Sequence, residues 1–495
     1  MKRITLCGSV LVAMSANLAG AAQPPPVLNA AACSALAQAT FSQTQVKSAA
    51  VVAAASGLPA YCEVQGIIRP VPGSEIGVVY RLPANWNRKV LALGGGGWMG
   101  NITLQTASEG LGRGYATLQT DAGHTTGAGF DASPWAINAD GSANKPALED
   151  FSHRAIHLMT VRGKEVVKSF YGAAASRAYY QGCSTGGRMG LMEVQRYPDD
   201  FDGVIAGAPV YTLQTQTSAQ LRTLAFTAPG ARLLPAHLTL INKAVLAACD
   251  AADGKADGVV RDPRACNFDP AKLACASGQA TDSCLVPAQI DALRKAYAGV
   301  KMANGAVAAY PLDKGGETGW ARFIPATSAG DPGGNSGGMY ALRGPLFGDP
   351  NFDMNKFTPE TVATVRSSWL AGVYEAKDPN IAPFVRKGGK LILWHGFSDP
   401  GPSARGTVEY YEAALKATPR ADAATRLFLA PGVGHCSGGA GPDRIDWLGA
   451  LDNWVEKNQA PEELPATKAG STLAWNVCAY PKLPTGAADG TYSCK

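Results

Sequence analysis

Charge, histidine and long hydrophobic runs are all scarce in this sequence. Charged residues make up 17% of the 495 residues and the net charge is +5, against about 25% charged residues in an average soluble domain. No basic run concentrates the surplus of lysine and arginine, so a nucleic-acid partner is not expected. No stretch beyond the N-terminal segment approaches ~18 uninterrupted apolar residues, so no membrane span is predicted. Glycine and proline are plentiful, with 57 and 33 residues, and indicate many turns and loops.

The N-terminal segment has the three-part layout of a secretory signal peptide. Residues 1–3 carry positive charge, residues 4–18 are mostly apolar, and residues 19–21 are small residues at cleavage spacing. We therefore expect residues 1–22 to be removed and the mature protein to be secreted or periplasmic. The alternative is an N-terminal anchor helix, for which the apolar segment is short.

Ten of the 11 cysteines remain after Cys7 leaves with the signal peptide. An even number of cysteines in an exported chain suggests up to five disulfides. Zinc binding is the rival interpretation, but the sequence has no Cys-x-x-Cys pair and only 6 histidines. Closeness in the sequence suggests four of the pairs: Cys33–Cys62, Cys249–Cys266, Cys275–Cys284 and Cys478–Cys494. This leaves Cys183 and Cys436, which are far apart in the sequence.

Short apolar strands alternate with helical segments in the first and last parts of the chain. The predicted strands are residues 89–93, 115–118, 178–181, 203–206, 390–394 and 426–430, and the predicted helices are residues 150–171, 190–196, 404–417 and 443–457. This alternation predicts an α/β fold with a mostly parallel sheet. Residues 211–386 lack the alternation and are rich in Gly, Pro, Asp and Asn, so we interpret them as a lid domain inserted into a sheet domain of residues 23–210 and 387–495.

The strongest chemical signal is a G-x-S-x-G motif between a predicted strand and a predicted helix. It consists of Gly182, Cys183, Ser184, Thr185 and Gly186. A nucleophile elbow requires this context, because the sharp turn exposes the serine hydroxyl at the sheet edge. A serine hydroxyl is a weak nucleophile, so it needs a general base that a carboxylate orients. The alternative is a tight strand–helix turn in which the serine only caps the helix.

Candidates for the base and the acid follow later strands. His435 lies in the loop after residues 426–430, and Asp399 lies in the loop after residues 390–394. The carboxyl ends of parallel strands meet at one sheet edge, and serine, acid, histidine is the chain order that this motif uses. We therefore predict that Ser184, Asp399 and His435 form a triad. The rivals are His124 and His395 for the base, and Asp443 and Asp446 for the acid.

The predicted reaction also needs two backbone N–H groups to stabilise negative charge on the substrate oxygen. Thr185 follows the nucleophile and supplies one, and the glycine-rich loop at residues 94–97 supplies the other, with Gly96 or Gly97 favoured. A phosphate-binding loop is the rival interpretation of this segment, but no Lys-Ser/Thr follows it.

The two leftover cysteines flank the predicted triad. Cys183 precedes Ser184 and Cys436 follows His435, so a triad would bring the two cysteines together. We expect a disulfide between them, because two free buried cysteines are unusual in an exported protein.

This Cys-Ser…Asp…His-Cys arrangement resembles the tannase/feruloyl esterase family, which includes mono(2-hydroxyethyl) terephthalate hydrolases. The resemblance spans nearly the whole mature chain, including the loop at residues 94–98 and the motif at residues 181–187. It implies an α/β-hydrolase core with a large inserted lid domain, and a serine esterase that hydrolyses aromatic carboxylic esters through an acyl-enzyme. Feruloyl or other hydroxycinnamoyl esters are the favoured substrates. The alternatives are galloyl esters, a mono(2-hydroxyethyl) terephthalate substrate, a non-catalytic ligand-binding homologue and a peptidase of the same fold.

The resemblance also implies a structural calcium ion in the lid, held by the acidic loop at residues 250–259. Oxygen ligands in a flexible loop suit calcium. The implied ligands are the carboxylates of Asp250, Asp253 and Asp257 and the backbone carbonyls of Lys255 and Val259. The loop is not an EF-hand, because Arg261 stands where that motif needs a bidentate glutamate. The alternative is a solvated turn rich in aspartate.

The lid should supply one wall of the substrate pocket. Its aromatic candidates for stacking on a planar acyl group are Trp320, Phe323, Tyr340, Phe347, Trp369 and Tyr374. Arg343 could bind a substrate carboxylate. The alternatives are core packing for each aromatic residue and a plain surface charge for the arginine.

Overall fold

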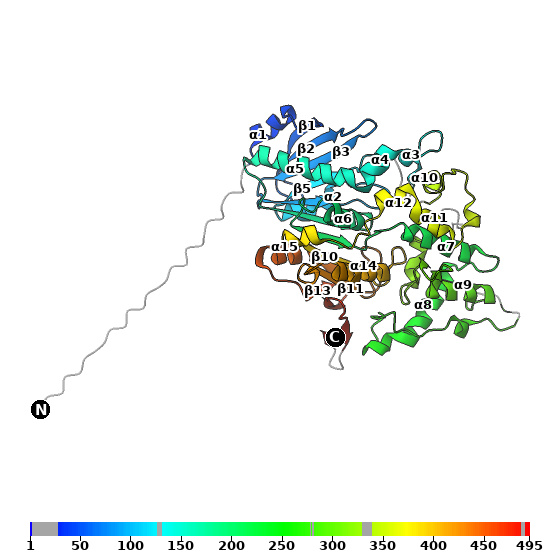
Figure 1. Cartoon of the computed structure of the whole chain (residues 1–495). Helices are drawn as coiled ribbons and strands as arrows, with labels where there is room; N and C mark the ends of the chain where they lie inside the picture. Colours follow the sequence, from blue (N-terminus) through cyan, green and yellow to red (C-terminus); the bar gives the residue numbers. More distant parts are fainter. Residues whose placement is uncertain (2–27, 126–130, 278, 280–281, 329–338, 487–490) are drawn as a thin grey trace.

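The computed structural model describes residues 1, 28–125, 131–277, 279, 282–328, 339–486 and 491–495. The predicted signal peptide therefore lies outside the described residues apart from Met1. A nine-stranded mixed sheet forms the centre of the molecule (Figure 1), with the strand order β1-β2-β3-β5-β4-β6-β7-β10-β11. The bounds are β1 Thr44–Val52, β2 Tyr61–Ile68, β3 Ile76–Pro83, β4 Lys89–Leu93, β5 Ala116–Thr120, β6 Arg177–Cys183, β7 Gly203–Gly207, β10 Lys390–Gly396 and β11 Thr425–Ala430.

The six strands expected from the sequence, β4 to β7 with β10 and β11, form the parallel part of this sheet. The antiparallel strands β1, β2 and β3 extend it at one edge. Sequence patterning missed these three strands. β1 is exposed or half-buried along its length, so it lacks the continuous apolar run that identifies a strand buried on both faces.

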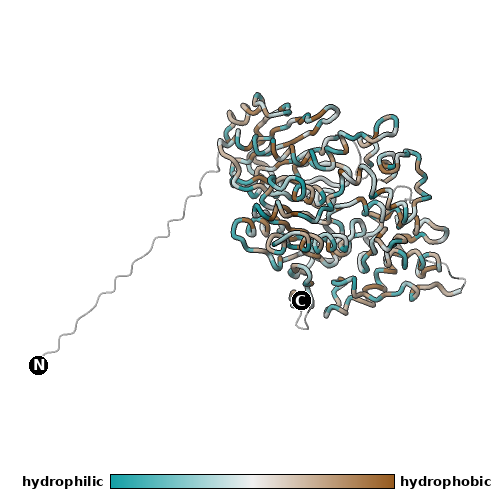
Figure 2. The backbone as a smooth tube through the Cα atoms, viewed as in Figure 1, coloured by the Kyte–Doolittle hydropathy of each residue, from teal (hydrophilic) through white to brown (hydrophobic). Residues whose placement is uncertain are grey.

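Helices cover both faces of the parallel strands. Successive residues of a strand point to opposite faces. In β4, Val90 and Ala92 belong to the core that contains α5 and α6, whereas Leu91 and Leu93 belong to the core that contains α2 and α15. Figure 2 shows the resulting hydrophobic stretches along the central strands. The helices of this part are α1 Ala30–Ala35, α2 Leu104–Gly112, α3 Ser133–Ala136, α4 Lys145–Glu149, α5 Ala155–Tyr171, α6 Thr185–Arg196, α14 Ala404–Ala417 and α15 Trp447–Lys457.

Three helices begin at other residues than the sequence suggested. α5 starts at Ala155 rather than at residue 150, because Asp150–Arg154 form a π-helix that leads into it. α6 starts at Thr185 rather than at residue 190, because the turn at Ser184 leads directly into the helix. α15 starts at Trp447 rather than at residue 443, because the Asp446 side chain caps the helix by accepting the Gly449 N–H at 2.9 Å. Both rival acids, Asp443 and Asp446, thus precede α15.

The chain between β7 and β10 is mainly helical and lies beside the sheet (Figure 1). Its own hydrophobic core includes Phe226, Leu238 and Trp320. Its elements are α7 Gln214–Thr227, α8 Pro235–Cys249, α9 Pro287–Ala298, α10 Arg343–Phe347, α11 Thr361–Ser367, α12 Trp369–Tyr374, α13 Ala382–Arg386 and the hairpin of β8 Val300–Lys301 and β9 Val307–Ala309. Within the described ranges, no helix is long and apolar enough to cross a membrane.

Five disulfides and a C-terminal set of short strands complete the structure. The strands are β12 Arg444–Ile445, β13 Glu463–Thr467, β14 Ala474–Cys478, β15 Pro484–Gly486 and β16 Tyr492–Cys494. The disulfides are Cys33–Cys62, Cys183–Cys436, Cys249–Cys266, Cys275–Cys284 and Cys478–Cys494. These are the pairs that sequence proximity and the predicted triad suggested.

Candidate active site

Ser184 occupies a sharp turn between β6 and α6. Its backbone has φ 63° and ψ −123°, a conformation that non-glycine residues rarely adopt and that marks strained functional turns. The turn requires neighbouring backbone segments to approach each other closely. A Cβ on Gly182 would lie 2.6 Å from the Gly186 carbonyl carbon, and one on Gly186 would lie 2.8 Å from the Gly95 oxygen. The glycines of the motif are thus required by packing.

The structure brings the three predicted triad residues together. The Ser184 hydroxyl donates to Nε2 of His435 across 2.8 Å. The Nδ1–H of His435 donates to Oδ2 of Asp399 across 2.6 Å. Asp399 and His435 are 7% and 8% exposed, so both hydrogen bonds are largely shielded from water. This arrangement can remove the serine proton while the carboxylate stabilises the imidazolium that results.

A second histidine donates to the same oxygen of Asp399 as His435 does. His395 is fully buried, and its Nε2–H donates to Asp399 Oδ2 and to the Pro402 carbonyl, each across 3.2 Å. Its Nδ1 lies 2.8 Å from the Thr407 hydroxyl. Sequence analysis considered His395 a rival for the base, but it orients the acid instead. The signal that could have found this role is its position only four residues before Asp399.

The charge of Asp399 follows from these two histidines. Burial by itself raises the pKa of the carboxyl group, but the charges and hydrogen bonds of His435 and His395 outweigh burial and lower it to about 2. The carboxylate therefore stays ionised throughout the neutral range, as its orienting function requires.

The backbone N–H groups of Thr185 and Gly97, two of the predicted oxyanion donors, have no acceptor among the described residues. The Thr185 hydroxyl donates to the Gly97 carbonyl and holds the two segments together. The N–H of Gly96, the other predicted donor, is bonded to the Met99 carbonyl at 3.2 Å. Of the predicted donors, Thr185 and Gly97 are therefore available for an oxyanion, whereas Gly96 is already bonded.

The triad is braced by a disulfide and by an aromatic ring. Cys183 and Cys436, the neighbours of Ser184 and His435, are bonded with Cα atoms 5.9 Å apart. The ring of Phe323, from the helical region, meets the His435 ring edge to face, with the centroids 4.7 Å apart.

Over residues 62–495 the sequence matches the family described as tannase and feruloyl esterase. The chain belongs to the tannase and feruloyl esterase family. It is 33% identical to the mono(2-hydroxyethyl) terephthalate hydrolase of Piscinibacter sakaiensis, over 92% of this chain and 89% of that protein. It is 34% identical to a probable feruloyl esterase of Arthroderma benhamiae, over 81% of this chain and 78% of that protein.

A solved structure agrees with this assignment. The feruloyl esterase B of Aspergillus oryzae matches with a TM-score of 0.84 and 26% identity, covering 94% of this chain and all of that chain. The protein is therefore a carboxylic ester hydrolase, and the hydrogen-bonded triad is the part of it that can attack an ester carbonyl.

A cavity of about 920 Å³ opens beside the glycine-rich loop of the esterase. Residues 94–97 and Cys183 form one side of it, and Trp394 and Trp447 are among its other lining residues. The rings of the two tryptophans are stacked with centroids 5.4 Å apart. Neither tryptophan was predicted to line a pocket, since one lies in a predicted strand and the other in a predicted helix of the sheet domain, outside the lid.

The three predicted substrate residues have other partners. Trp320 is 1% exposed and packs against Phe226 and Tyr297 in the core of the helical region, so no face of its ring is left for a ligand. Trp369 is half-buried under the Lys145 ammonium, which lies 5.2 Å from its ring. Arg343 donates to the carbonyl of Tyr340 at 2.9 Å. The core-packing alternative therefore describes Trp320, and the aromatic candidate that reaches the triad is Phe323.

The predicted calcium ligands lie in one loop of the esterase but do not converge on one point. Both carboxylate oxygens of Asp250 accept backbone N–H groups, from Asp257 at 3.2 Å and Gly258 at 2.8 Å. Asp253 and Asp257 instead pair with the guanidinium of Arg261. In this arrangement the side chains do not fit a calcium ion.

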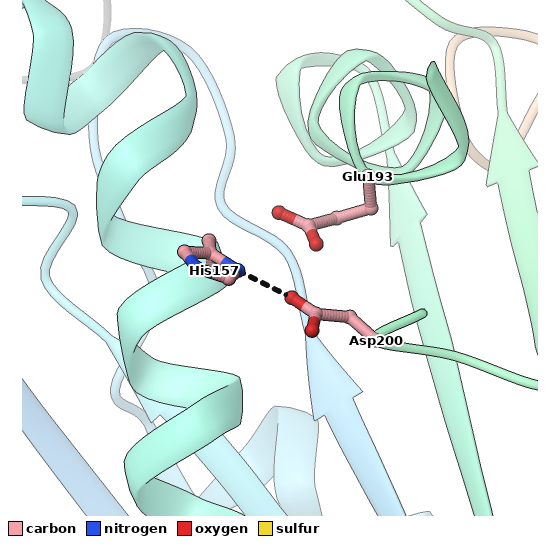
Figure 3. Close-up of side chains that lie close together, drawn as sticks. All are labelled: His157, Glu193 and Asp200. Carbon is pink, nitrogen blue, oxygen red and sulfur yellow. Dashed lines mark hydrogen bonds and ion pairs between the residues drawn. The ribbon is translucent and has the colours of Figure 1, made fainter. Parts of the chain in front are cut away.

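A second cluster of ionisable side chains lies where α5 meets α6 (Figure 3). His157 of α5, Glu193 of α6 and Asp200 point toward one another, and their ligand atoms lie within 4.8 Å of one another. His157 Nδ1 donates to Asp200 at 2.7 Å. Burial and the neighbouring charge of Asp200 raise the pKa of Glu193 well above its usual value. The cluster lies about two and a half turns along α6 from Ser184.

Proposed function

We propose that this protein is an exported serine esterase that hydrolyses aromatic carboxylic esters, with feruloyl and other hydroxycinnamoyl esters favoured. The observation that supports the proposal best is the hydrogen-bonded row of Ser184, His435 and Asp399 beside two unused N–H groups. The names of the relatives, which include feruloyl esterases and a terephthalate monoester hydrolase, support the aromatic acyl group. Galloyl esters and mono(2-hydroxyethyl) terephthalate are the alternative substrates.

In the proposed mechanism, Oγ of Ser184 attacks the ester carbonyl carbon while its proton passes to Nε2 of His435. The carbonyl oxygen becomes an oxyanion that accepts the N–H groups of Thr185 and Gly97. The intermediate collapses to an acyl-enzyme, and the departing alcohol takes the proton from His435. Water then attacks the acyl group in the same way and releases the acid and the free serine.

The helical region, residues 211–386, acts in this proposal as the lid domain of the α/β-hydrolase core. Phe323 lies against His435, and Arg222 of α7 donates to the Pro400 carbonyl at 3.1 Å, next to Asp399. The region thus touches both the base and the acid loop, where it can shield the substrate from water. The cavity beside residues 94–97 offers room for one part of the ester.

Export is supported by the N-terminal layout and by the disulfides. Five disulfides are characteristic of a protein that folds in an oxidising compartment. The proposed location is therefore the periplasm or the extracellular medium.

The test is hydrolysis of methyl ferulate, methyl gallate, mono(2-hydroxyethyl) terephthalate and a p-nitrophenyl ester by the disulfide-intact protein. We expect the highest kcat/KM on methyl ferulate. Ser184→Ala should lower kcat by at least ~10³-fold, because the variant keeps the oxyanion donors but lacks the nucleophile. Ser367→Ala, at an exposed position of α11, is the matched control and should leave the rates unchanged.

Two results would contradict the proposal. Equal rates for wild type and Ser184→Ala on every ester would remove the serine mechanism. A clear preference for the gallate or the terephthalate ester would keep the mechanism and replace the favoured substrate.

A further inference from the structure

The acidic loop of the helical region already contains a cation, the guanidinium of Arg261. Its two terminal nitrogens pair with Asp253 and Asp257, one with each carboxylate. The backbone N–H of Arg261 donates to the second oxygen of Asp253 at 3.1 Å. One arginine therefore joins the two ends of the loop, as a bridging metal ion would.

The guanidinium of Arg261 is buried within the structure and is not a surface charge. The Arg261 side chain is 1% exposed, and an arginine is almost never buried to this extent unless it is paired. Its charged group lies over the rings of Trp475 and Tyr492, at 4.8 Å and 4.6 Å from the centroids. Cation–π contacts of this kind stabilise a desolvated guanidinium.

The same group fastens the loop to the C-terminal strands. Trp475 belongs to β14 and Tyr492 to β16, and the two strands are joined by the Cys478–Cys494 disulfide. The Tyr492 hydroxyl donates to Oδ2 of Asp257 at 2.7 Å. Asp257 is thus held by the arginine and the tyrosine together, and the loop is anchored to a part of the chain more than 200 residues away in sequence.

We propose that Arg261 takes the place of a divalent cation in this loop, so that the loop holds its structure without calcium. A calcium ion needs six to eight oxygen ligands at 2.3–2.6 Å, and the guanidinium lies between two of the three carboxylates that would supply them. The calcium site that the family resemblance implies is replaced in this chain by an internal ion-pair network.

The experiment uses the full mature protein and reads out stability and metal content, so its result is independent of ester hydrolysis. After exhaustive dialysis against EDTA, wild type and variants are compared by thermal unfolding with and without millimolar calcium. Calcium in the undialysed protein is measured by mass spectrometry. For wild type we expect no stoichiometric calcium and the same Tm in EDTA and in calcium.

Arg261→Gln should lower the Tm in EDTA by several degrees, because it leaves two largely buried carboxylates without the positive charge that compensates them. Added calcium should restore most of this loss, since the freed carboxylates can then bind the ion. Arg264→Gln is the matched control: Arg264 is a nearby arginine, about one-third exposed, that pairs with Asp262 and lies 5.5 Å from the Phe397 ring, outside the acidic loop. Its Tm should change little and should not respond to calcium.

Three outcomes would overturn the proposal. The first is stoichiometric calcium in the wild-type protein or a lower wild-type Tm in EDTA. The second is an Arg261→Gln variant as stable as Arg264→Gln. The third is an Arg261→Gln variant whose Tm does not respond to calcium. If Arg261→Gln does not fold, Arg261→Lys provides the comparison, with a partial loss expected because lysine cannot bridge two carboxylates in a fixed fork.

Discussion

The stability of the folded protein depends on the protonation state of one buried side chain, Glu193. The residue is 1% exposed, and neither carboxyl oxygen has a hydrogen-bond donor among the described groups. Asp200, its neighbour, already accepts the His157 N–H. Burial first, and then the charge of Asp200, raise the pKa of Glu193. Burial therefore favours the protonated form of Glu193.

Glu193→Gln tests this assignment. A folded-state pKa above the unfolded value of about 4.3 means that wild type loses stability as pH rises from that value toward the folded-state pKa. Glutamine has no such proton to lose. The free energy of unfolding of the variant minus that of wild type should therefore increase by about 1 kcal/mol or more from pH 4.5 to pH 8. Urea unfolding at both pH values measures it.

Glu360→Gln, at an exposed position just before α11, is the control for the charge change alone. The same stability difference between Glu193→Gln and wild type at both pH values would show that Glu193 is ionised in the folded protein.

At the scale of residues, the sequence predicted the side chains that follow strands. Ser184, Asp399 and His435 each stand just beyond an apolar strand, and a parallel sheet places such positions at one edge. Side chains that depend on packing between distant segments could not be predicted. Phe323 meets His435 only because the helical region folds back over the site, and Arg261 enters the acidic loop because the C-terminal strands supply its aromatic partners.

At the scale of elements, the glycine-rich loop after β4 lies directly against the first turn of α6. A Cβ on Gly94 would lie 2.2 Å from the Tyr180 hydroxyl oxygen and 2.6 Å from the Gly186 Cα, whereas a Cβ on Gly96 would have no atom within 4 Å. Neighbouring atoms therefore leave no room for a side chain at Gly94, whereas Gly96 has room for one.

We expect Gly94→Ala to destabilise the protein by about 1–3 kcal/mol, as overpacking of a core does. It should also lower kcat, because the loop that carries the Gly97 N–H must move away from α6. Gly96→Ala should change the free energy of unfolding by no more than about 0.5 kcal/mol. Guanidinium unfolding of both variants is the measurement. Equal costs at the two positions would mean that the close approach to α6 does not constrain the loop.

The elements that the sequence predicted well are those with one dominant physical signal. Strands buried on both faces form continuous apolar runs, and all six parallel strands were located in this way. α6 was placed five residues too late, because two of its first residues are Gly186 and Gly187, which are poor helix formers. They are present because Cβ atoms there would collide with residues 95 and 207. Tertiary packing thus outweighs helix propensity at this site.

At the scale of the whole molecule, the Cys183–Cys436 disulfide joins positions 253 residues apart in the sequence. It connects the loops that carry the nucleophile and the base across β6, β7, β10 and β11. A crosslink over so long a segment removes much of the freedom of the unfolded chain.

Replacing Cys183 and Cys436 together by alanine should destabilise the protein by about 5 kcal/mol in the chain-entropy description, against about 2.5 kcal/mol for Cys275 and Cys284, whose loop spans 9 residues. The first variant should also lose kcat, since the serine and the base are no longer tied together, whereas the second should keep it. Differential scanning calorimetry with parallel rate measurements checks both. A similar loss of stability and activity in the two variants would contradict this expectation.

Because this disulfide holds the two catalytic loops together, the activity of the site should depend on when and where the disulfide forms. A newly made chain in a reducing cytosol carries Cys183 and Cys436 as thiols, so the loops of Ser184 and His435 are held only by non-covalent contacts. Under the proposed export, the bridge closes by oxidation once the chain has left the cytosol. An esterase assembled in this order would reach its full activity only outside the compartment in which it is made.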